Sequence, residues 1–395
     1  MAAKDDAHQH HQTMMSKLRD KGIFHSSDVE AAFAVTPRHL FLPNTPLDVV
    51  YSDRAVGLKS DTGGLLISSS SQPTMMAIML AQLQLKSGDN VLEIGTATGY
   101  NAAIMAHLVG DEGRVTTIEI EGDLARQAQR NLQRAQVSGV TVVHGDGAQG
   151  YAPRASYDHI LATVGIWDVP PAWLNQLKPR GTLVAPLILD GIQVSACFRA
   201  QPDGTYLSHD NRPCSFVYMR GQNATPNFRR QVGSTSLYIL SDEVEKVDTA
   251  ALYLLLSDDH EINHLDTRLD THAFWYGFQL YMMLNEIPDY VFALFSVIEG
   301  QKAHGVEGNG IALFSRGSAA LINYGERGIA HCFAGADAFL EAQRLLDEWN
   351  ANGQPHQDRL RVRLIPSAHD KPAITTGRLF ERRHHYIHVW METDS

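Results

Sequence analysis

Apolar and polar positions along the chain follow one pattern up to about residue 220 and another beyond it. In the first part, short apolar runs that predict strands lie at 91–95, 115–118, 140–144, 157–163 and 182–189. Helical periodicity precedes the first strand, at 14–33 and 74–80, and separates the next ones, at 100–108 and 123–135. Strands that alternate with helices at this spacing predict an α/β domain with a parallel, doubly wound sheet.

The second part begins after a mostly polar stretch, 221–235, which we interpret as a linker between a domain at 1–220 and another at 236–395. The later segments mix helical and alternating patterns. Helices are predicted at 252–256, 275–284 and 336–349, and strands at 290–298, 310–314, 319–324, 360–366 and 384–390. This pattern predicts a smaller α+β domain. By elimination, we assign it to recognition of a substrate peptide or to formation of a homodimer.

Length and composition agree with two domains and narrow the partners. The chain has 395 residues, is 44% hydrophobic and carries a net charge of −11 without a Lys/Arg cluster, which disfavours nucleic acid. No apolar stretch is long enough for a signal sequence or a membrane span, and three scattered cysteines suit a reducing compartment. We therefore expect a cytoplasmic protein. We interpret His8, His10 and His11 as part of a frayed polar terminus, and we predict no metal site.

The run from Val91 to Asn101 carries the strongest chemical signal. A strand that ends in Gly95, a turn that includes Thr96, and a helix that opens near Gly99 predict a nucleotide-type pocket at the helix N-terminus. Two acids also lie at strand ends. Glu93 and Glu119 favour a neutral or cationic adenosine ligand over a pyrophosphate, and the ligand that we infer is S-adenosylmethionine. Glu119 is placed to accept hydrogen bonds from the ribose hydroxyls. Asp146 and Gly147 are placed to take the amino edge of adenine.

Four serines, Ser68 to Ser71, stand before Gln72 and Pro73. With proline at the first helical position, they bring hydroxyls and free N–H groups together at a helix start. Composition alone leaves two interpretations open: a functional group of hydroxyls, or an N-cap with more hydroxyls than it needs.

The first 220 residues resemble the protein-L-isoaspartate O-methyltransferase family. The matching segments occur in the family's order: 18–23, 35–43, 51–53, 67–73, 91–100, 145–147 and 169–179. The resemblance implies a class I S-adenosylmethionine-dependent methyltransferase domain with a Rossmann-like fold. It also implies a peptide or protein substrate that bears aspartate or isoaspartate. Ser71 matches the serine at the family's active site, with Ser70 and Ser69 as possible replacements, and Glu93 is implied to lie near the methionine moiety.

The longer format resembles a subgroup of these enzymes that is associated with ribosomally synthesised, modified peptides. The features are the serine run, Phe216–Gly221 at the end of the catalytic domain, and the added C-terminal domain. Those relatives methylate an aspartyl or isoaspartyl side chain, and the ester then collapses to a succinimide. General protein repair and a non-catalytic peptide-binding scaffold are the alternatives.

Several positions depart from the family pattern. Ala97 replaces a usual glycine, Thr163-Val164-Gly165 replaces Thr-Ala-Ala, and Tyr218 and Arg220 replace proline and threonine. Residues 168–171, Asp-Val-Pro-Pro, superficially resemble the Asp-Pro-Pro-Tyr signature of nucleic-acid amino-methylating enzymes. Because valine interrupts that signature, we predict only a helix start there.

Overall fold

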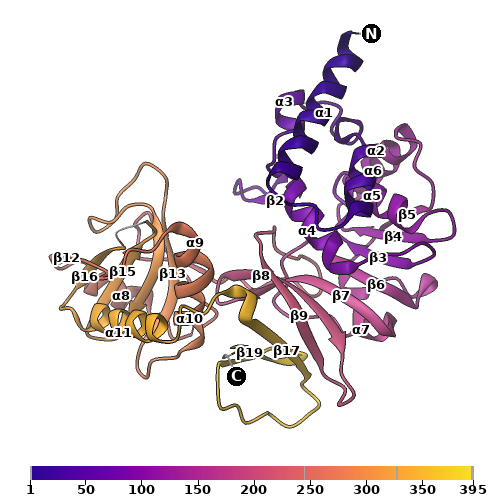
Figure 1. The fold of residues 1–395 in the computed structure, drawn as a ribbon. Helices are drawn as coiled ribbons and strands as arrows, with labels where there is room; N and C mark the ends of the chain where they lie inside the picture. The colour runs from indigo at the N-terminus through magenta and orange to yellow at the C-terminus, as the bar shows by residue number, and fades with distance from the viewer. Residues whose placement is uncertain (1, 244, 326–327, 393–395) are drawn as a thin grey trace. The chain divides into compact units, whose positions relative to one another are not determined.

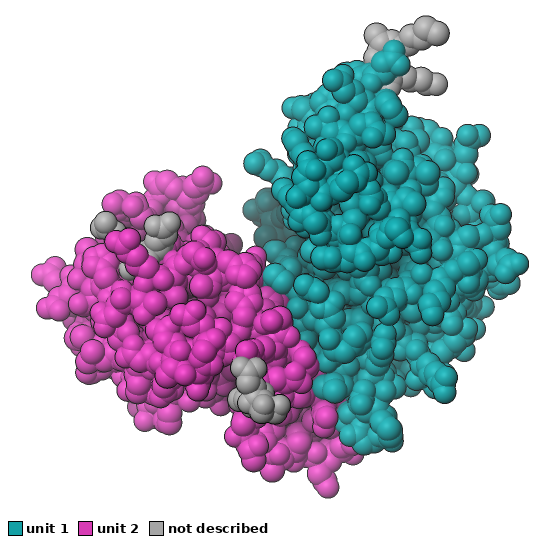
Figure 2. All heavy atoms as spheres, in the orientation of Figure 1, with its two compact units in different colours: residues 1–187, 193–225, 383–385 teal, residues 188–192, 226–382, 386–395 magenta. Residues whose placement is uncertain are grey.

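The structure is a computed structural model that describes residues 2–243, 245–325 and 328–392. The chain forms two compact units (Figure 2). Unit 1 contains residues 1–187, 193–225 and 383–385, and unit 2 contains residues 188–192, 226–382 and 386–395. The main division after residue 225 falls within the stretch that reads as a linker. Residues 383–385 also belong to unit 1, whereas the sequence predicts two domains that are each continuous along the chain.

Within the described residues, unit 1 is built on seven strands of a ten-stranded sheet, in the order β9-β8-β7-β6-β3-β4-β5 (Figure 1). The strands are β3 (Asn90–Ile94), β4 (Arg114–Glu119), β5 (Val140–His144), β6 (Tyr157–Ala162), β7 (Leu177–Leu189), β8 (Ile192–Ala200) and β9 (Tyr206–Pro213). Strands β3 to β7 pair in parallel, and β8 pairs with β9 antiparallel. The doubly wound α/β fold is therefore confirmed. Strand β7 begins earlier than the apolar run indicated, because it also includes residues 178–180, Lys-Pro-Arg.

The α-helices in the described part of unit 1 are α1 (Ala2–Asp20), α2 (Ser27–Val35), α3 (Leu47–Val50), α4 (Pro73–Leu83), α5 (Tyr100–Val109), α6 (Gly122–Arg134) and α7 (Pro171–Gln176). The buried strand β3 has its last four residues, Val91–Ile94, at 3% exposure or less. Helix α7 begins at Pro171 and so confirms the helix start that was predicted after Asp168.

The N-terminal residues correct one expectation. Helix α1 begins at Ala2, not near residue 14, so the His-rich segment is helical and not frayed. Its buried positions Ala7, His11, Met14 and Leu18 recur at helical spacing and form one stripe. The ring of His11 packs edge-on against Tyr51, with 5.5 Å between the ring centroids. The stripe was missed because it includes a histidine that sequence patterning counts as polar.

A two-stranded antiparallel hairpin precedes the helix α4. It consists of β1 (Val56–Ser60) and β2 (Leu66–Ser70), with Val56 opposite Ser70. Strand β2 therefore carries three of the four serines directly to the start of α4. The hairpin turn lies at residues 61–65, and Asp61 accepts hydrogen bonds there from the backbone N–H groups of Gly63 and Leu65.

Unit 2 contains an antiparallel sheet with the strand order β10-β11-β13-β14-β15-β16-β12. The strands are β10 (Arg229–Gln231), β11 (Leu237–Leu240), β12 (His260–His264), β13 (Val291–Val297), β14 (Asn309–Phe314), β15 (Ala319–Asn323) and β16 (Ile329–Phe333). Its helices are α8 (Thr249–Leu255), α9 (Thr271–Ala273), α10 (Gln279–Leu284) and α11 (Asp337–Ala351), with a π-helical turn at Phe274–Phe278. Strands β17 (Leu360–Pro366), β18 (Arg378–Glu381) and β19 (His385–Met391) follow. The expected α+β organisation is confirmed.

Within residues 2–243, 245–325 and 328–392, no helix is long and apolar enough to cross a membrane.

Candidate active site

The turn between β3 and α5 forms the centre of a pocket in unit 1 that is lined by many polar residues. Gly95 and Gly99 have φ angles of 99° and 83°, which favour glycine. A Cβ atom on Gly95 would lie 2.6 Å from the Thr163 Oγ1, so no larger residue fits there. Ala97 also has a positive φ, of 49°. This explains why glycine suits that position in related turns, and it shows that alanine still allows the turn.

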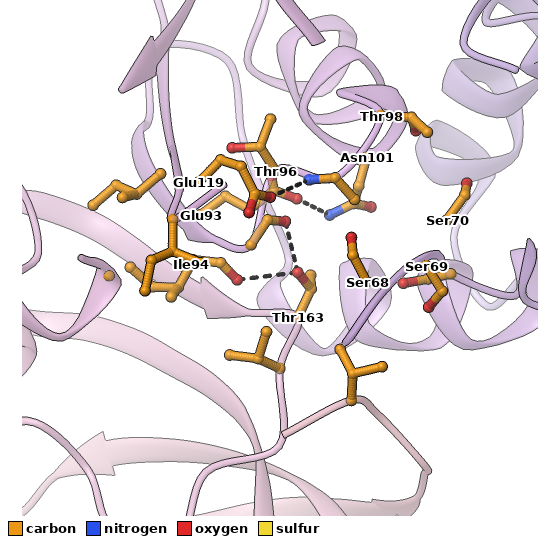
Figure 3. A pocket seen from close by; sticks show the side chains of 18 of the residues that line it. Ser68, Ser69, Ser70, Glu93, Ile94, Thr96, Thr98, Asn101, Glu119 and Thr163 are labelled. Carbon is orange, nitrogen blue, oxygen red and sulfur yellow. Dashed lines mark hydrogen bonds between the residues drawn. The ribbon is translucent and has the colours of Figure 1, made fainter. Parts of the chain in front are cut away.

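Glu93 lies at the end of β3 beneath this turn and is fully buried. Its carboxylate accepts hydrogen bonds from the Asn101 Nδ2 at 2.7 Å and from the Thr117 Oγ1 at 2.6 Å. Burial raises the pKa of Glu93 to about 7. The Asn101 Oδ1 is buried and has no hydrogen-bond partner in the described part of the chain. Figure 3 shows Asn101 directed at Glu93.

Glu119 lies at the end of β4, the strand next to β3, and is 5% exposed. Its two carboxylate oxygens accept hydrogen bonds from the backbone N–H groups of Ala97 at 2.9 Å and Glu121 at 3.0 Å. Burial raises its pKa, although both hydrogen bonds act in the opposite direction. Each oxygen keeps a further lone pair for a ligand. Glu119 lines the same pocket as Glu93, Gly95 and Thr96, so the structure brings these predicted residues together.

Asp146 and Gly147 follow β5, and the structure places them differently. Gly147 lines the pocket, and a Cβ atom there would lie 2.5 Å from the Ile94 Cγ2. The Asp146 carboxylate is directed at backbone: it accepts hydrogen bonds from the N–H groups of Ala148 at 2.9 Å and Gln222 at 2.7 Å. Asp146 therefore fixes the 221–222 loop beside the pocket, and its predicted contact with adenine stays a prediction.

All four serines line this pocket. Alternation along β2 buries Ser68 and Ser70, at 6% and 2% exposure, and leaves Ser69 between them half-buried. In Figure 3, Ser68 and Ser69 lie across the pocket from Glu119. None of these hydroxyls caps helix α4. Asp53 does so, because its carboxylate accepts hydrogen bonds from the Thr74 N–H at 3.0 Å and the Thr74 Oγ1 at 2.8 Å. The N-cap interpretation of the serine run is therefore wrong.

Arg38 anchors the end of the serine run through the backbone carbonyl groups of Ser70 and Ser71. Its guanidinium is completely buried and donates to backbone carbonyl groups rather than to a carboxylate. The Nη2 donates to the Ser71 carbonyl at 2.8 Å and to the Ser70 carbonyl at 3.3 Å. The Nη1 donates to the Val50 carbonyl at 3.0 Å and to the Ser52 carbonyl at 3.3 Å. Five hydrogen-bond donors on a planar fork allow one side chain to join these segments.

The remaining wall comes from residues 163–164 and 217–220. Arg220 donates from Nη1 to the Glu121 Oε1 at 2.6 Å. Lys59 of the hairpin strand β1 also pairs with Glu121, and its Nζ lies 3.0 Å from the Asp123 Oδ2. These pairs join the hairpin, the start of α6 and the 217–220 segment around the pocket.

Sequence reasoning gave no role to Asn101 and Thr117, which line or support the pocket, and it did not rank Ser68 within the serine run. The strand register could have identified Thr117, because it pairs directly with Glu93 across the parallel strands β3 and β4. Asn101 could have been identified from its place in the first turn of α5. Ser68 could not be ranked against the other three serines without the alternation of β2.

A parallel sheet whose first strand ends in a glycine turn, with an acid at the end of the next strand, is a nucleoside-binding arrangement, and it suits the S-adenosylmethionine of a class I methyltransferase. Comparison with known proteins agrees with this class. The family described as protein-L-isoaspartate(D-aspartate) O-methyltransferase matches residues 9–224. The chain belongs to this family, and it is an S-adenosylmethionine-dependent O-methyltransferase.

Individual relatives match about half of the chain. The chain is 38% identical over 205 residues to protein-L-isoaspartate O-methyltransferase of Ignicoccus hospitalis, a match that covers 52% of this chain and 94% of the relative. It is 37% identical over 210 residues to the protein of the same name from Methanopyrus kandleri, covering 53% of this chain and 90% of the relative. A solved structure titled protein-L-isoaspartate O-methyltransferase covers 96% of this chain and 99% of its own, with a TM-score of 0.52 and 24% identity. This likeness shows a shared fold along nearly the whole chain.

Proposed function

We propose that the protein methylates the side-chain carboxylate of an aspartyl or isoaspartyl residue in a precursor peptide, and that the ester then forms a succinimide. The observation that carries this proposal is the shared pocket of Glu93, Glu119, the Gly95 turn and the serine run. One side of that pocket suits an adenosine ligand. The other side presents serine hydroxyls, which can donate hydrogen bonds to a substrate carboxylate without forming an ion pair with it.

The residues present fit the methyl donor. Gly95 leaves room for close approach to the backbone, and Glu119 offers lone pairs for ribose hydroxyls. The unpartnered Asn101 Oδ1 and the carboxylate of Glu93 suit the cationic methionine moiety. Thr96, Gly99, Asp146 and Gly147 complete the proposed cofactor contacts. When bound, S-adenosylmethionine supplies an electrophilic methyl group on a sulfonium.

The substrate carboxylate is already ionised at neutral pH, so no general base is needed. One carboxylate oxygen forms a bond to the methyl carbon while the carbon–sulfur bond breaks, and the sulfur keeps the electron pair. The protein contributes position and removal of water. We assign the orienting hydroxyl to Ser71, with Ser70 as the alternative. The Ser70 Oγ accepts a hydrogen bond from the Arg38 Nη2 at 3.4 Å, which leaves its own proton free to donate.

The methyl ester then reacts within the peptide. The backbone nitrogen of the following residue forms a bond to the ester carbonyl carbon, methoxide leaves, and the N–H proton completes methanol. The product is a succinimide. This step needs no further reactant.

The resemblance to the peptide-modifying subgroup supports a precursor peptide as the substrate, and unit 2 is then the proposed recognition unit. We place the reaction in the cytoplasm. The three cysteines all lie within the described residues and form no disulfide there. Burial raises the pKa of the Cys197 thiol to about 12, as suits an inert thiol in a reducing compartment.

The test uses the full chain, S-adenosylmethionine with a labelled methyl group, and three peptides of one sequence that carry aspartate, isoaspartate or asparagine at one position. We expect an alkali-labile methyl ester on the aspartyl or isoaspartyl peptide, followed by loss of methanol, and no label on the asparaginyl peptide. Ser71→Ala and Ser70→Ala lower kcat by about tenfold or less. Ser87→Ala, in the exposed turn before β3, is the matched control.

The outcomes separate the alternatives. Equal label on isoaspartyl peptides of unrelated sequences indicates general repair. Binding of S-adenosylhomocysteine without label on any peptide or protein indicates a scaffold. Either result would overturn the precursor-peptide proposal.

A further inference from the structure

Residues 383–385 belong to unit 1, although the residues on both sides of them belong to unit 2. The contact that holds them there is made with Asp168. The His384 backbone N–H donates to the Asp168 Oδ2 at 2.6 Å, and the His385 Nδ1 donates to the Oδ1 at 2.8 Å. The side chains of His385 and Asp168 are 3% and 1% exposed. The contact is therefore excluded from solvent.

Asp168 depends on this segment for its hydrogen bonds. Among the described residues, the other donor to its carboxylate is the N–H of the adjacent Val169, at 2.8 Å from the Oδ1. A buried carboxylate that loses its donors keeps the full cost of desolvation, so the loop must move if the donors are removed. Residues 384 and 385 thus supply two of the three donors to the Asp168 carboxylate in the described part of the chain.

Asp168 ends a short loop that forms part of the pocket wall. Within this loop, Val164 lines the pocket, and Gly165 forms a bridge with Tyr218. The Gly165 N–H donates to the Val217 carbonyl at 2.8 Å, and the Met219 N–H donates to the Gly165 carbonyl at 2.8 Å. Val217, Tyr218 and Met219 line the pocket as well.

A side-chain hydrogen bond also ties Asp168 to the residues that follow 217–219. The Asn223 Nδ2 donates to the Asp168 carbonyl at 2.8 Å. Asp168 is therefore fixed at its side chain by residues 384–385 and at its backbone by the segment that follows the pocket wall. A shift of Asp168 would strain the Asn223 hydrogen bond and the loop that carries Val164.

We infer that His385 is a positioning residue for methyl transfer: through Asp168 it holds the 164–168 loop and residues 217–219 in the geometry that the reaction needs. The site in unit 1 is then complete only when residues 384 and 385 are in place. The kinetic part of this inference rests on the proposed function.

The test uses three variants of the full chain. In His385→Asn, the shorter side chain can place an amide N–H where the Nδ1 lies, whereas the longer side chain of His385→Gln places its amide near the Nε2 position. His385→Leu removes the donor. His388→Leu, which replaces a half-buried histidine on the same strand β19, is the matched control.

Two readouts are measured with thermal unfolding as a reference. The first is kcat and KM for the peptide that the wild type methylates, beside the affinity for S-adenosylhomocysteine. The second is amide hydrogen exchange of segments 164–169 and 217–222, which requires no activity. We expect His385→Leu and His385→Gln to lower kcat by about 10- to 100-fold and to speed exchange in both segments. His385→Asn should retain most of both properties, and cofactor affinity should change less than kcat.

The results distinguish the two proposals. If the wild type methylates no peptide, the proposed function fails, and hydrogen exchange alone still decides the positioning role. If all three variants lose thermal stability equally while exchange in both segments and kcat stay unchanged, the inference is overturned. Equal loss in His385→Asn and His385→Gln would also overturn it.

Discussion

Arg38→Met should separate the anchoring of the serine segment from the packing around it. Methionine keeps much of the apolar stem but removes every donor to the carbonyl groups of Val50, Ser52, Ser70 and Ser71. Two of these hydrogen bonds, to Val50 at 3.0 Å and to Ser71 at 2.8 Å, have ordinary lengths. A hydrogen bond to a charged donor contributes about 1.5–3 kcal/mol, and relief of the buried charge offsets part of the loss. We therefore expect the free energy of unfolding to fall by about 3 kcal/mol.

Urea unfolding measures this change, and Arg54→Met is the control because the Arg54 side chain is exposed. Arg38→Lys should lie between the wild type and Arg38→Met, because an ammonium group cannot reach both groups of carbonyls. We also expect kcat to fall more than the affinity for S-adenosylhomocysteine, since Arg38 contacts the serine segment and not Glu119. An unfolding free energy for Arg38→Met within about 0.5 kcal/mol of the control would refute this reasoning.

Further predictions concern the two acids and the helix cap. Burial raises the folded-state pKa of Glu93 from 4.5 to about 7. The folded state therefore binds the Glu93 proton more tightly than the unfolded state does. This proton binding stabilises the fold at about pH 5 and no longer does so at about pH 8, so the free energy of unfolding falls by about 2–3 kcal/mol between these pH values. Glu93→Gln should remove it, as urea unfolding at both pH values would detect, and an unchanged pH slope would contradict the assignment. Glu119→Gln should weaken S-adenosylhomocysteine binding by about 10- to 100-fold in calorimetry, whereas the exposed Glu112→Gln should not. Asp53→Ala should cost about 1 kcal/mol of unfolding free energy by removing the cap of α4, and an equal loss in the exposed Asp48→Ala would argue against a capping role.

The sequence predicts those parts of the site that depend on local pattern. Apolar runs identify the parallel strands, and each acid at a strand end then falls at one edge of the sheet. For this reason Glu93, Glu119 and the Gly95 turn could be placed together before the structure was known. Residues whose role depends on a distant partner could not be placed in this way. The Asp146 carboxylate accepts from Gln222, and Asp168 accepts from His385, across separations that no local period encodes.

Arg38 shows a second limit. A single arginine beside a proline indicates a solvated charge, because arginine is almost never fully buried without a carboxylate partner. Here carbonyl groups from two segments take the place of that partner. Only the three-dimensional path of residues 50–54 and 70–71 brings those carbonyl groups together, so composition could not indicate that this guanidinium is buried.

The serine run shows how register, rather than chemistry, distinguishes four identical side chains. Four adjacent residues with the same side chain are chemically equivalent in the sequence, and the strand distinguishes them by direction alone. Strand β2 turns Ser68 and Ser70 to one face and Ser69 to the other, while Ser71 follows the last residue of the strand. A slip of one residue would exchange these faces. Pairing of Ser70 with Val56 and the hydrogen bonds from Arg38 to the Ser70 and Ser71 carbonyls both oppose such a slip. The direction in which each serine faces is therefore fixed by Arg38 and by the hairpin, two features outside the serine run itself.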